Sequence, residues 1–457
     1  MRYFSTRDKS LDLSFKDIFF KGLSNDGGLF LPKNIPVLSE TDLKKFQDYN
    51  FQEMSYEIFN LFTGVTFKKN DLKKIINDAY TTFRNEKIVD IKKIDHISFL
   101  QLYHGPTLAF KDIAMQVLGQ MYNFLLKDSK KVINLITATS GDTGAAAIDA
   151  VQGKKSINIF VLHPHNKISS IQRKLMTTYE ASNVFNIAIK GSFDDCQKIV
   201  KDMFVDQGFS NQINMSGVNS INWARIVCQI VYYFYSFFKL QKNNISYSVP
   251  TGNFGDIYAG YIAKKMGLPI NKLIVATNKN DILNRVINTG EYKPDTVKPS
   301  ITPSMDIQVA SNFERLLFYI LDENDSSVSS LMNELSSKGI FTLKKTEIEK
   351  IKKDFECIKI TDEETEGIIH KIYKDHQFIV DPHTATGFGA ANKIKNLGDI
   401  IVLGTAHPYK FNDTIKKAIG KNLEAPKHLK LDIDKKETFD IIENSNLEVK
   451  KYILSKI

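Results

Sequence analysis

The spacing of apolar residues in this 457-residue chain changes near residue 96. Before that point, apolar positions recur at helical spacing, for example over 71–80, and predict a mostly helical N-terminal domain covering 1–95. After it, short apolar runs alternate with helical patterns. The runs that we expect to form strands cover 132–139, 157–162, 184–189, 245–249, 273–276 and 400–403. Strands alternating with helices favour parallel α/β sheets, which bind ligands at the carboxyl ends of their strands.

The most apolar stretch covers residues 226–238, contains no charged residue and is rich in tyrosine and phenylalanine. Its thirteen positions fall short of the roughly 20 that a membrane-spanning helix needs, so we expect a buried or interface helix and no membrane partner. The chain also opens without the apolar segment of a secretory signal. Three widely spaced cysteines, Cys196, Cys228 and Cys357, indicate a reducing compartment rather than a disulfide scaffold. These features predict a cytoplasmic enzyme.

The net charge of +9 comes mostly from lysines that are scattered along the chain, as in the pairs Lys73-Lys74 and Lys344-Lys345. Scattered lysine pairs are typical of solvated faces, and no run of arginine and aromatic residues indicates a nucleic-acid partner. A basic approach to an active site would favour a phosphorylated substrate through electrostatic steering.

Lys111 is the strongest candidate for chemistry. Gly105 and Pro106 signal a turn, a short apolar stretch follows, and the lysine stands where a helix can begin. A lysine in apolar surroundings loses part of its charge by desolvation, which makes its amine a usable nucleophile for Schiff-base formation. The ordinary alternative is a surface lysine, and the neighbouring motifs are what argue against it.

Two glycine-containing loops each follow a predicted strand and precede a predicted helix. The first comprises Ser140, Gly141, Asp142, Thr143 and Gly144, and the second comprises Thr251, Gly252, Asn253, Phe254, Gly255 and Asp256. Glycines let the backbone approach a ligand, and the free N–H groups of the following helix attract an anion. The second loop matches neither of the nucleotide-binding glycine patterns. Together with a Schiff-base lysine, the two loops suggest pyridoxal phosphate, one loop holding the cofactor phosphate and the other an amino-acid carboxylate.

Several segments also resemble signature segments of the threonine synthase family, which uses pyridoxal phosphate and has fold type II. In chain order they are 3–7, 25–32, 104–112, 139–144, 219–225, 250–256 and 403–408. They span nearly the whole chain, and their agreement in order is more specific than any one motif. The N-terminal extension is similar to that of the bacterial and fungal long form.

The resemblance implies an α/β fold with two parallel-sheet lobes, a mostly helical N-terminal domain and the cofactor between the lobes. The large cofactor-binding domain would comprise 96–130 and 215–457, and the small domain 131–214. Two polar stretches, 288–304 and 321–343, are expected to be surface excursions rather than domain linkers. The resemblance leaves the choice between monomer and homodimer open.

The resemblance further implies roles for individual residues. Lys111 would carry the cofactor and shuttle protons, and Thr405 would meet the pyridine nitrogen, with a helix N-cap as the alternative for Thr405. Gly252, Asn253, Phe254, Gly255 and Asp256 would hold the cofactor phosphate, mostly through backbone N–H groups. Ser140, Gly141, Asp142 and Thr143 would meet the substrate carboxylate and the ring oxygen of the cofactor. Ser220 and Arg225 would bind the phosphate of O-phospho-L-homoserine, which suits the planar fork of arginine.

Three histidines and one carboxylate keep alternative interpretations. The carboxylate of Asp142 is an unusual neighbour for an anion, so we expect its backbone N–H or a protonated or hydrogen-bonded carboxyl to act. His383 would either line the site or close a helix N-terminus. His163 and His165 would suit a metal pair, but no third ligand lies nearby in the sequence, so a turn after a strand is the better interpretation and no metal is expected.

The reaction implied by the resemblance converts O-phospho-L-homoserine and water to L-threonine and phosphate. It combines γ-elimination of phosphate with β-addition of water. One alternative is a threonine synthase-like phospho-lyase that stops after phosphate elimination. The other is a catalytically silent regulatory paralogue, against which the intact Lys111 and Thr405 argue.

Overall fold

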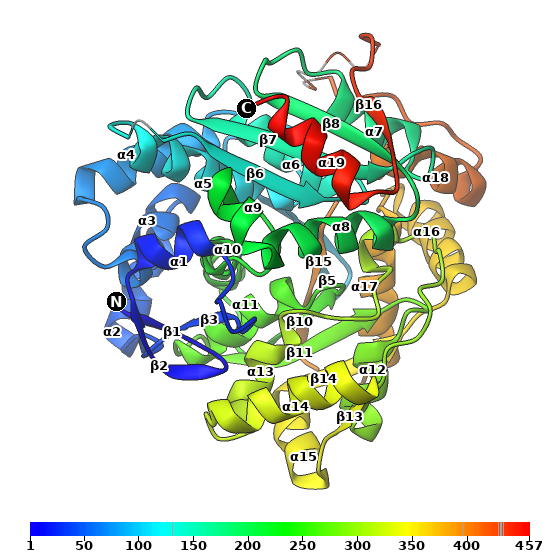
Figure 1. Cartoon of the computed structure of the whole chain (residues 1–457). Helices are drawn as coiled ribbons and strands as arrows, with labels where there is room; N and C mark the ends of the chain where they lie inside the picture. The colour runs from blue at the N-terminus through cyan, green and yellow to red at the C-terminus, as the bar shows by residue number, and fades with distance from the viewer. Residues whose placement is uncertain (130, 396, 428, 430–431, 433) are drawn as a thin grey trace.

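Two sheets form the framework of the computed structural model, which describes residues 1–129, 131–395, 397–427, 429, 432 and 434–457 (Figure 1). The larger has the order β14 (Phe355–Lys359), β11 (Ile270–Thr277), β10 (Ile245–Pro250), β15 (Asp399–Gly404), β5 (Ile97–Gln101) and β4 (Asp90–Ile94). The smaller has the order β16 (Asp440–Glu443), β8 (Val184–Lys190), β7 (Ile157–Pro164), β6 (Ile133–Ala138) and β9 (Met215–Ser216). Every strand pair in them is parallel except β4 with β5. The predicted α/β class with two parallel sheets is confirmed, and we call the two units the large lobe and the small lobe.

Each of the six apolar runs predicted as strands forms one, namely β6, β7, β8, β10, β11 and β15. Helices follow these strands and cover the sheets, so the central strands have both faces buried. All six residues of β10 are buried, for example. Burial on both faces explains why these strands are near-continuous apolar runs instead of alternating ones.

The end of the chain returns to the small lobe. β16 pairs with β8 in parallel, and α19 (Asn446–Leu454) packs on α8 (Phe193–Val205) through buried Val449 and Ile453 (Figure 1). The assignment of all of 215–457 to the large domain is therefore wrong for 440–457, and also for β9 at residues 215–216. β16 is a short strand at the edge of its sheet with mostly exposed side chains, so it lacks the apolar pattern that marks the central strands.

The N-terminal region contains both helices and a small antiparallel sheet. Its helices are α1 (Phe15–Lys21), α2 (Glu40–Lys45), α3 (Phe51–Thr63) and α4 (Lys69–Tyr80), and its sheet has the order β2 (Asp8–Leu13), β1 (Tyr3–Ser5) and β3 (Phe30–Pro32). The strands are three to six residues long, too short to interrupt the helical pattern of the sequence.

The helix α10 (Trp223–Leu240) is the centre of the main core. Residues 223–238 are all buried, and α10 packs against α3, α5 (Lys111–Leu126) and α11 (Gly255–Lys265). The expectation of a buried helix at 226–238 is confirmed. In the part of the chain that the structure describes, no helix is both long and apolar enough to cross a membrane.

The remaining elements cover the two sheets or connect them. The helices are α6 (Asp142–Val151), α7 (Ser170–Thr177), α9 (Gln207–Gln212), α12 (Ile282–Thr289), α13 (Phe313–Ile320), α14 (Asp325–Lys338), α15 (Lys345–Asp354), α16 (Asp362–His376), α17 (Pro382–Lys393) and α18 (Asn412–Ile419). The described part of the chain also contains the short 3-10 helices η1 (Phe46–Asp48), η2 (Pro303–Met305) and η3 (Pro408–Phe411) and the ribbon of β12 (Glu291–Tyr292) and β13 (Phe341–Thr342).

Candidate active site

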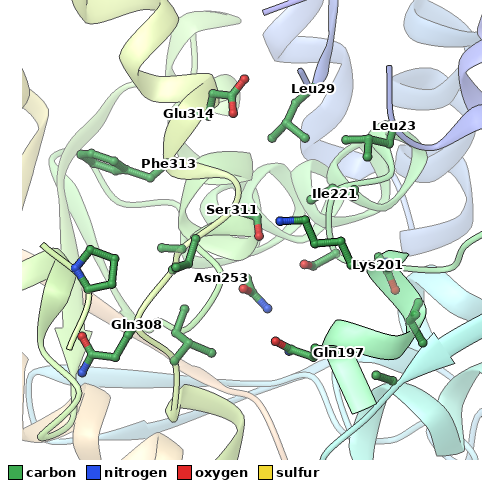
Figure 2. A pocket seen from close by; sticks show the side chains of 18 of the residues that line it. Leu23, Leu29, Gln197, Lys201, Ile221, Asn253, Gln308, Ser311, Phe313 and Glu314 are labelled. Atoms are coloured by element: carbon green, nitrogen blue, oxygen red, sulfur yellow. The ribbon is translucent and has the colours of Figure 1, made fainter. Parts of the chain in front are cut away.

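A cavity of about 930 Å³ is lined by residues of both lobes and of the N-terminal region. Lys111 and Ser140 line it, as do Ser220, Asn253 and Ser304. Figure 2 shows Gln197 and Lys201 on one side of this cavity and Asn253, Gln308 and Ser311 on the other. Ser140 follows β6 and Asn253 follows β10, so the cavity lies at the carboxyl ends of parallel strands in both sheets. This is where an α/β fold binds its ligands.

The turn before Lys111 is fixed by buried hydrogen bonds. The Asp112 carboxylate accepts the Thr107 N–H at 2.8 Å and the Thr107 hydroxyl at 2.5 Å. A side chain at Gly105 would collide with Asp112, since an added Cβ would lie 2.3 Å from the Asp112 Cβ. The Phe110 N–H donates to the Thr405 carbonyl at 2.9 Å. The sequence therefore presents Lys111 at the first position of α5 and places Thr405 beside it.

Lys111 is nearly buried, with a side chain that is 11% exposed. Its Nζ lies 3.2 Å from Asp142 Oδ2 and donates to the Ser304 hydroxyl at 3.4 Å. Burial lowers the pKa of Lys111; the charge of Asp142 opposes this change, and the charges of Lys410 and Arg225 add to it. An amine whose pKa is lowered by burial can lose its proton and react, as Schiff-base chemistry requires.

The loop at 252–256 presents a row of backbone N–H groups that no capping group in the described ranges satisfies. The backbone N–H groups of residues 252–256 have no hydrogen-bond partner among the residues that the structure describes. Phe254, at the N-cap of α11, has a left-handed backbone with φ of 63°, a conformation that costs a bulky residue about 1–3 kcal/mol. Its side chain packs on Phe313 and Phe355, which holds it there. Free N–H groups at a helix N-terminus form a site for an anion such as phosphate.

The side chain of Asp256 takes no part in that row. It turns into the core, where its Oδ1 accepts hydrogen bonds from the hydroxyls of Tyr232 and Tyr233. Burial raises the pKa of Asp256 to about 7, although the two tyrosine donors work in the opposite direction. Asp256 can therefore act on a bound phosphate through its backbone N–H.

The loop at 140–144 is organised by Thr139. Its hydroxyl oxygen accepts the N–H groups of Gly141 at 2.9 Å and Gly144 at 3.0 Å. Gly141 has φ of 129°, which only glycine adopts readily. The N–H groups of Ser140, Asp142 and Thr143 are without a partner in the described part of the chain. The loop can bind a carboxylate with these donors and with the hydroxyls of Ser140 and Thr143, which line the cavity.

The carboxylate of Asp142 turns away from the cavity and joins a buried cluster. Its Oδ1 lies 2.5 Å from Lys410 Nζ and accepts the Gln172 amide at 3.1 Å, and its Oδ2 accepts the Ser304 hydroxyl at 3.1 Å. Burial by itself would raise the pKa of Asp142, but the charges of Lys111 and Lys410 hold it well below its ordinary value. Of the two options for Asp142, the structure favours the backbone N–H for an anion and assigns the carboxylate to the lysines.

Ser220 and Arg225 lie at the start of α10 but differ in exposure. Ser220 lines the cavity, whereas Arg225 is 2% exposed and does not line it. The Arg225 Nη1 donates to the Val218 carbonyl at 3.1 Å, and its Nε has no partner. Burial lowers the pKa of Arg225 to about 10. Within the described ranges no carboxylate pairs with this guanidinium, so its charge is available to an anion.

Ser304 is a site residue that the sequence did not reveal. It ends the stretch 288–304, which was expected to be a surface excursion, and this expectation is wrong at its end, where Ser304 contacts Lys111 and Asp142. Asp306 holds the turn, since its carboxylate accepts hydrogen bonds from Asn278, Asn280 and Ser300. A chain of polar residues without an apolar pattern gives no sign of such a fold-back.

His383 is buried next to the site, but it does not itself line the cavity, and the N-cap of its helix is Asp381. His383 lies in the first turn of α17, where its Nδ1 is 2.9 Å from the Asp381 carboxylate, and its Nε2 accepts the Ser304 N–H at 3.3 Å. This pattern assigns the ring proton to Nδ1. His383 thus supports the Ser304 turn beside the cavity.

The residues present fit pyridoxal phosphate. The cofactor needs a reactive lysine, a phosphate site and a partner for its pyridine nitrogen. Lys111 and the N–H row at 252–256 supply the first two, and the hydroxyl of Thr405, a buried residue, is available as the third. An added Cβ at Gly252 would lie 2.5 Å from the Ser304 carbonyl, so the loop can follow this path only with glycine. No group of three or more His, Cys, Asp or Glu side chains in the described ranges is arranged to hold a metal.

Family models cover most of the chain. The model "Threonine synthase N terminus" matches residues 2–80, "Pyridoxal-phosphate dependent enzyme" matches 86–334, and "Threonine synthase, C-terminal" matches 384–453. The three matches follow one another in the order expected for one protein.

Curated relatives and solved structures agree with the family models. A threonine synthase of Pseudomonas aeruginosa is 40% identical over 99% of this chain and 98% of its own length. A threonine synthase structure from Brucella melitensis, described as PLP bound, superposes with a TM-score of 0.95 at 40% identity and covers 100% of this chain and 99% of that one. The yeast threonine synthase structure has a TM-score of 0.93 at 38% identity, with 100% and 98% covered.

Proposed function

Because this chain belongs to the threonine synthase family of pyridoxal-phosphate-dependent enzymes, we propose that it converts O-phospho-L-homoserine and water to L-threonine and phosphate. The observation that carries the proposal is the convergence of Lys111, the 140–144 loop, the 252–256 loop and Ser220 on one cavity. Together, this substrate and cofactor require one reactive amine, two separate phosphate sites and one carboxylate site.

The cofactor would be held by this chain at three points. Lys111 would bind its aldehyde carbon, the N–H groups of 252–256 its phosphate, and the Thr405 hydroxyl its pyridine nitrogen. When bound, pyridoxal phosphate supplies the electron sink that acidifies the carbon next to the substrate amine. A hydroxyl partner leaves the pyridine nitrogen mostly unprotonated, which softens that sink.

The substrate would be oriented from its two anionic ends. The 140–144 loop would hold the carboxylate through free N–H groups and hydroxyls. Ser220 and the unpaired guanidinium of Arg225 would hold the γ-phosphate, and the same charge would stabilise the phosphate as it leaves. Exposed Lys201, which lines the cavity, adds a positive charge on the side of the small lobe (Figure 2).

Lys111 would carry the protons. Its amine would remove a proton at Cα and then one at Cβ, phosphate would leave Cγ with the electrons of the C–O bond, and a proton would return to Cγ. Water then adds its hydroxyl at Cβ, a proton returns to Cα, and the remaining proton goes to the departing phosphate. In sum, Cγ exchanges phosphate for hydrogen, Cβ exchanges hydrogen for hydroxyl and Cα keeps its hydrogen, so atoms and charge balance. Ser304 and Asp142, both within hydrogen-bonding distance of the Lys111 amine, would orient it.

A cytoplasmic location is part of the proposal. The three cysteines are buried thiols rather than disulfides, which suits a reducing compartment.

Product analysis by NMR tests the function. The protein is loaded with pyridoxal phosphate and incubated with O-phospho-L-homoserine, and in parallel with O-phospho-L-threonine. We expect threonine and phosphate in equal amounts from the first compound. A keto acid and ammonia would instead identify a phospho-lyase, and the absence of product from both compounds, with cofactor bound, would identify a silent paralogue.

A further inference from the structure

Lys410 is a second buried lysine in the site, with no role in the proposed reaction. It lies in η3, directly after the segment of Thr405, and its side chain is fully buried. Its Nζ lies 2.5 Å from Asp142 Oδ1 and donates to the Thr107 carbonyl at 3.1 Å. A buried ammonium is costly unless it is paired, so this placement needs a reason.

The cluster contains two cations and one anion. Lys111 and Lys410 approach different oxygens of the same carboxylate, Oδ2 and Oδ1 of Asp142. Gln172 and Ser304 supply its other hydrogen bonds. If Lys111 loses its proton, Lys410 and Asp142 remain as a matched ion pair. If Lys410 were absent, a neutral Lys111 would leave a buried carboxylate without a counter-charge.

We propose that Lys410 is a positioning residue that neutralises Asp142, so that Lys111 can be uncharged beside it and is free to react. The charge of Asp142 favours the ammonium form of Lys111, and the charge of Lys410 works against that form. Other charges act on the same groups: Arg225 acts on Lys111, Lys111 acts on Asp256, and His383 acts on Asp142. Lys410 differs from Arg225 and His383 in its contact with Asp142.

The backbone fixes Lys410 relative to Lys111. The Thr107 that accepts from Lys410 is the residue that Asp112 holds in the turn before Lys111. The His407 N–H donates to the Leu108 carbonyl, which joins the two segments a second time. The segment that provides Thr405 thus also provides the counter-charge.

The reactivity of Lys111 in the cofactor-free protein tests the proposal directly. An amine-acylating reagent is applied over a range of pH, and the labelled fraction of the Lys111 peptide is followed by mass spectrometry. We expect Lys410→Gln, which keeps a donor for Thr107 but no charge, to slow labelling of Lys111 at neutral pH by about tenfold or more, because an unopposed opposite charge favours the ammonium form. Lys410→Arg should label within a few-fold of the wild type.

A second substitution, Asp142→Asn, distinguishes an effect of charge on Lys111 from a structural effect of losing Lys410. Asp142→Asn in the Lys410→Gln background should restore labelling, since no unpaired carboxylate is left, and Asp142→Asn alone should label faster than the wild type. Lys127→Gln, an exposed lysine after the same helix α5, is the control and should have no effect. In the protein loaded with cofactor, the acid limb of the pH profile of kcat/KM should shift with the labelling: to higher pH in Lys410→Gln, where labelling is slower, and to lower pH in Asp142→Asn, where labelling is faster.

A folded Lys410→Gln protein that labels at the wild-type rate would overturn the proposal, as would a double variant that stays as slow as the single one. Loss of folding in Lys410→Gln that Asp142→Asn reverses would support it, because the unpaired carboxylate would be the cause. Loss of folding in both variants would mean a purely structural role. The inference rests on the proposed function only for the need of a neutral Lys111, and the labelling needs no substrate, so it can fail independently of the product test.

Discussion

The hydroxyl of Ser304 donates to the carboxylate of Asp142 at 3.1 Å, joining two residues that lie 162 positions apart. Asp142 begins α6 in the small lobe, and Ser304 lies in the 3-10 helix η2, in the segment of chain between β11 and β14 of the large lobe. The bond therefore connects the lobes directly beside the Lys111 amine. Any movement of one lobe against the other changes the surroundings of that amine.

Replacing Lys111 should abolish turnover. In Lys111→Ala we expect a loss of about 100- to 10,000-fold or more, since the variant has neither the covalent anchor nor the proton carrier. Borohydride reduction of the loaded wild type followed by peptide mapping should place the label on Lys111. Lys127→Ala is the matched control and should stay active. A label on a peptide without Lys111 would disprove the assignment.

Replacing Gly252 should damage the phosphate loop. An added Cβ lies 2.5 Å from the Ser304 carbonyl, a backbone atom that cannot give way without moving the turn beside Lys111. Gly252→Ala should therefore cost about 1–3 kcal/mol and weaken cofactor binding, measured by titration of the cofactor-free protein. Gly367→Ala is the contrast: in the helix α16 its Cβ meets nothing within 4 Å, and it should stabilise by about 0.5–1 kcal/mol. Equal cofactor affinity in the two variants would contradict the close approach.

Replacing Arg225 should affect the substrate phosphate. Loss of a charged partner of this kind costs about 2–4 kcal/mol, which lowers kcat/KM with O-phospho-L-homoserine roughly thirty- to a thousand-fold in Arg225→Ala. Binding of threonine, which has no phosphate, should persist. Arg225→Lys should recover only part of the activity, because an ammonium lacks the planar fork.

Arg315 provides the structural comparison. Its guanidinium donates to the carbonyls of Phe30 and Ile221, so we expect Arg315→Ala to lower the free energy of unfolding. If threonine binding and phosphohomoserine turnover fall together in Arg225→Ala, Arg225 is structural and the phosphate site lies elsewhere.

Removing the Thr405 hydroxyl should loosen the cofactor. A single hydrogen bond contributes about 0.5–1.5 kcal/mol, so the Kd for pyridoxal phosphate should rise roughly two- to tenfold in Thr405→Ala. The Thr405 carbonyl that accepts from Phe110 is retained in this variant, so the backbone should keep its path. Thr405→Asp should favour side eliminations by making a stronger electron sink. Unchanged affinity and product ratio in both variants would remove Thr405 from the site.

Asp256 should make stability depend on pH. Its folded pKa of about 7 lies above its ordinary value of 3.8, so the folded protein keeps a proton that the unfolded chain releases. This stabilising contribution is complete below about pH 4 and is lost as the pH rises through 7. Asp256→Asn keeps an acceptor for Tyr232 and Tyr233 without a charge. In urea unfolding of the cofactor-free protein, it should gain up to a few kcal/mol over the wild type at about pH 8 and much less at about pH 4. A difference that is the same at both pH values would rule out this titration.

Local patterns were enough to predict much of the framework and part of the site. Strands buried on both faces, such as β10, leave apolar runs, and the turn at Gly105 and Pro106 marks the start of the helix that begins with Lys111. The glycine loops are local too, because strand, glycine and helix follow one another in the chain. Their free N–H groups then follow from the helix geometry.

The features of the site that the sequence did not predict depend on contacts between distant segments. Nothing in the sequence distinguishes Lys410 from other lysines, and only the fold brings it into contact with Asp142. Ser304 lies in a polar stretch whose turn is held by a hydrogen bond from Asn278 to Asp306, 28 positions later. The orientation of the Asp142 carboxylate, away from the cavity and towards two lysines, follows from the same long-range packing. No spacing within one segment encodes such contacts.

The pairing of β16 with β8 has a consequence for the growing protein on the ribosome. Residue 187 meets residue 440, so β8 stays an open sheet edge until almost the whole chain has been synthesised. An unpaired parallel edge is a template for other chains. The nascent protein must therefore carry this unpaired edge through most of translation. A premature stop after Lys410 and before Asp440 would leave the edge permanently uncovered, although every residue of the reaction site would already have been made.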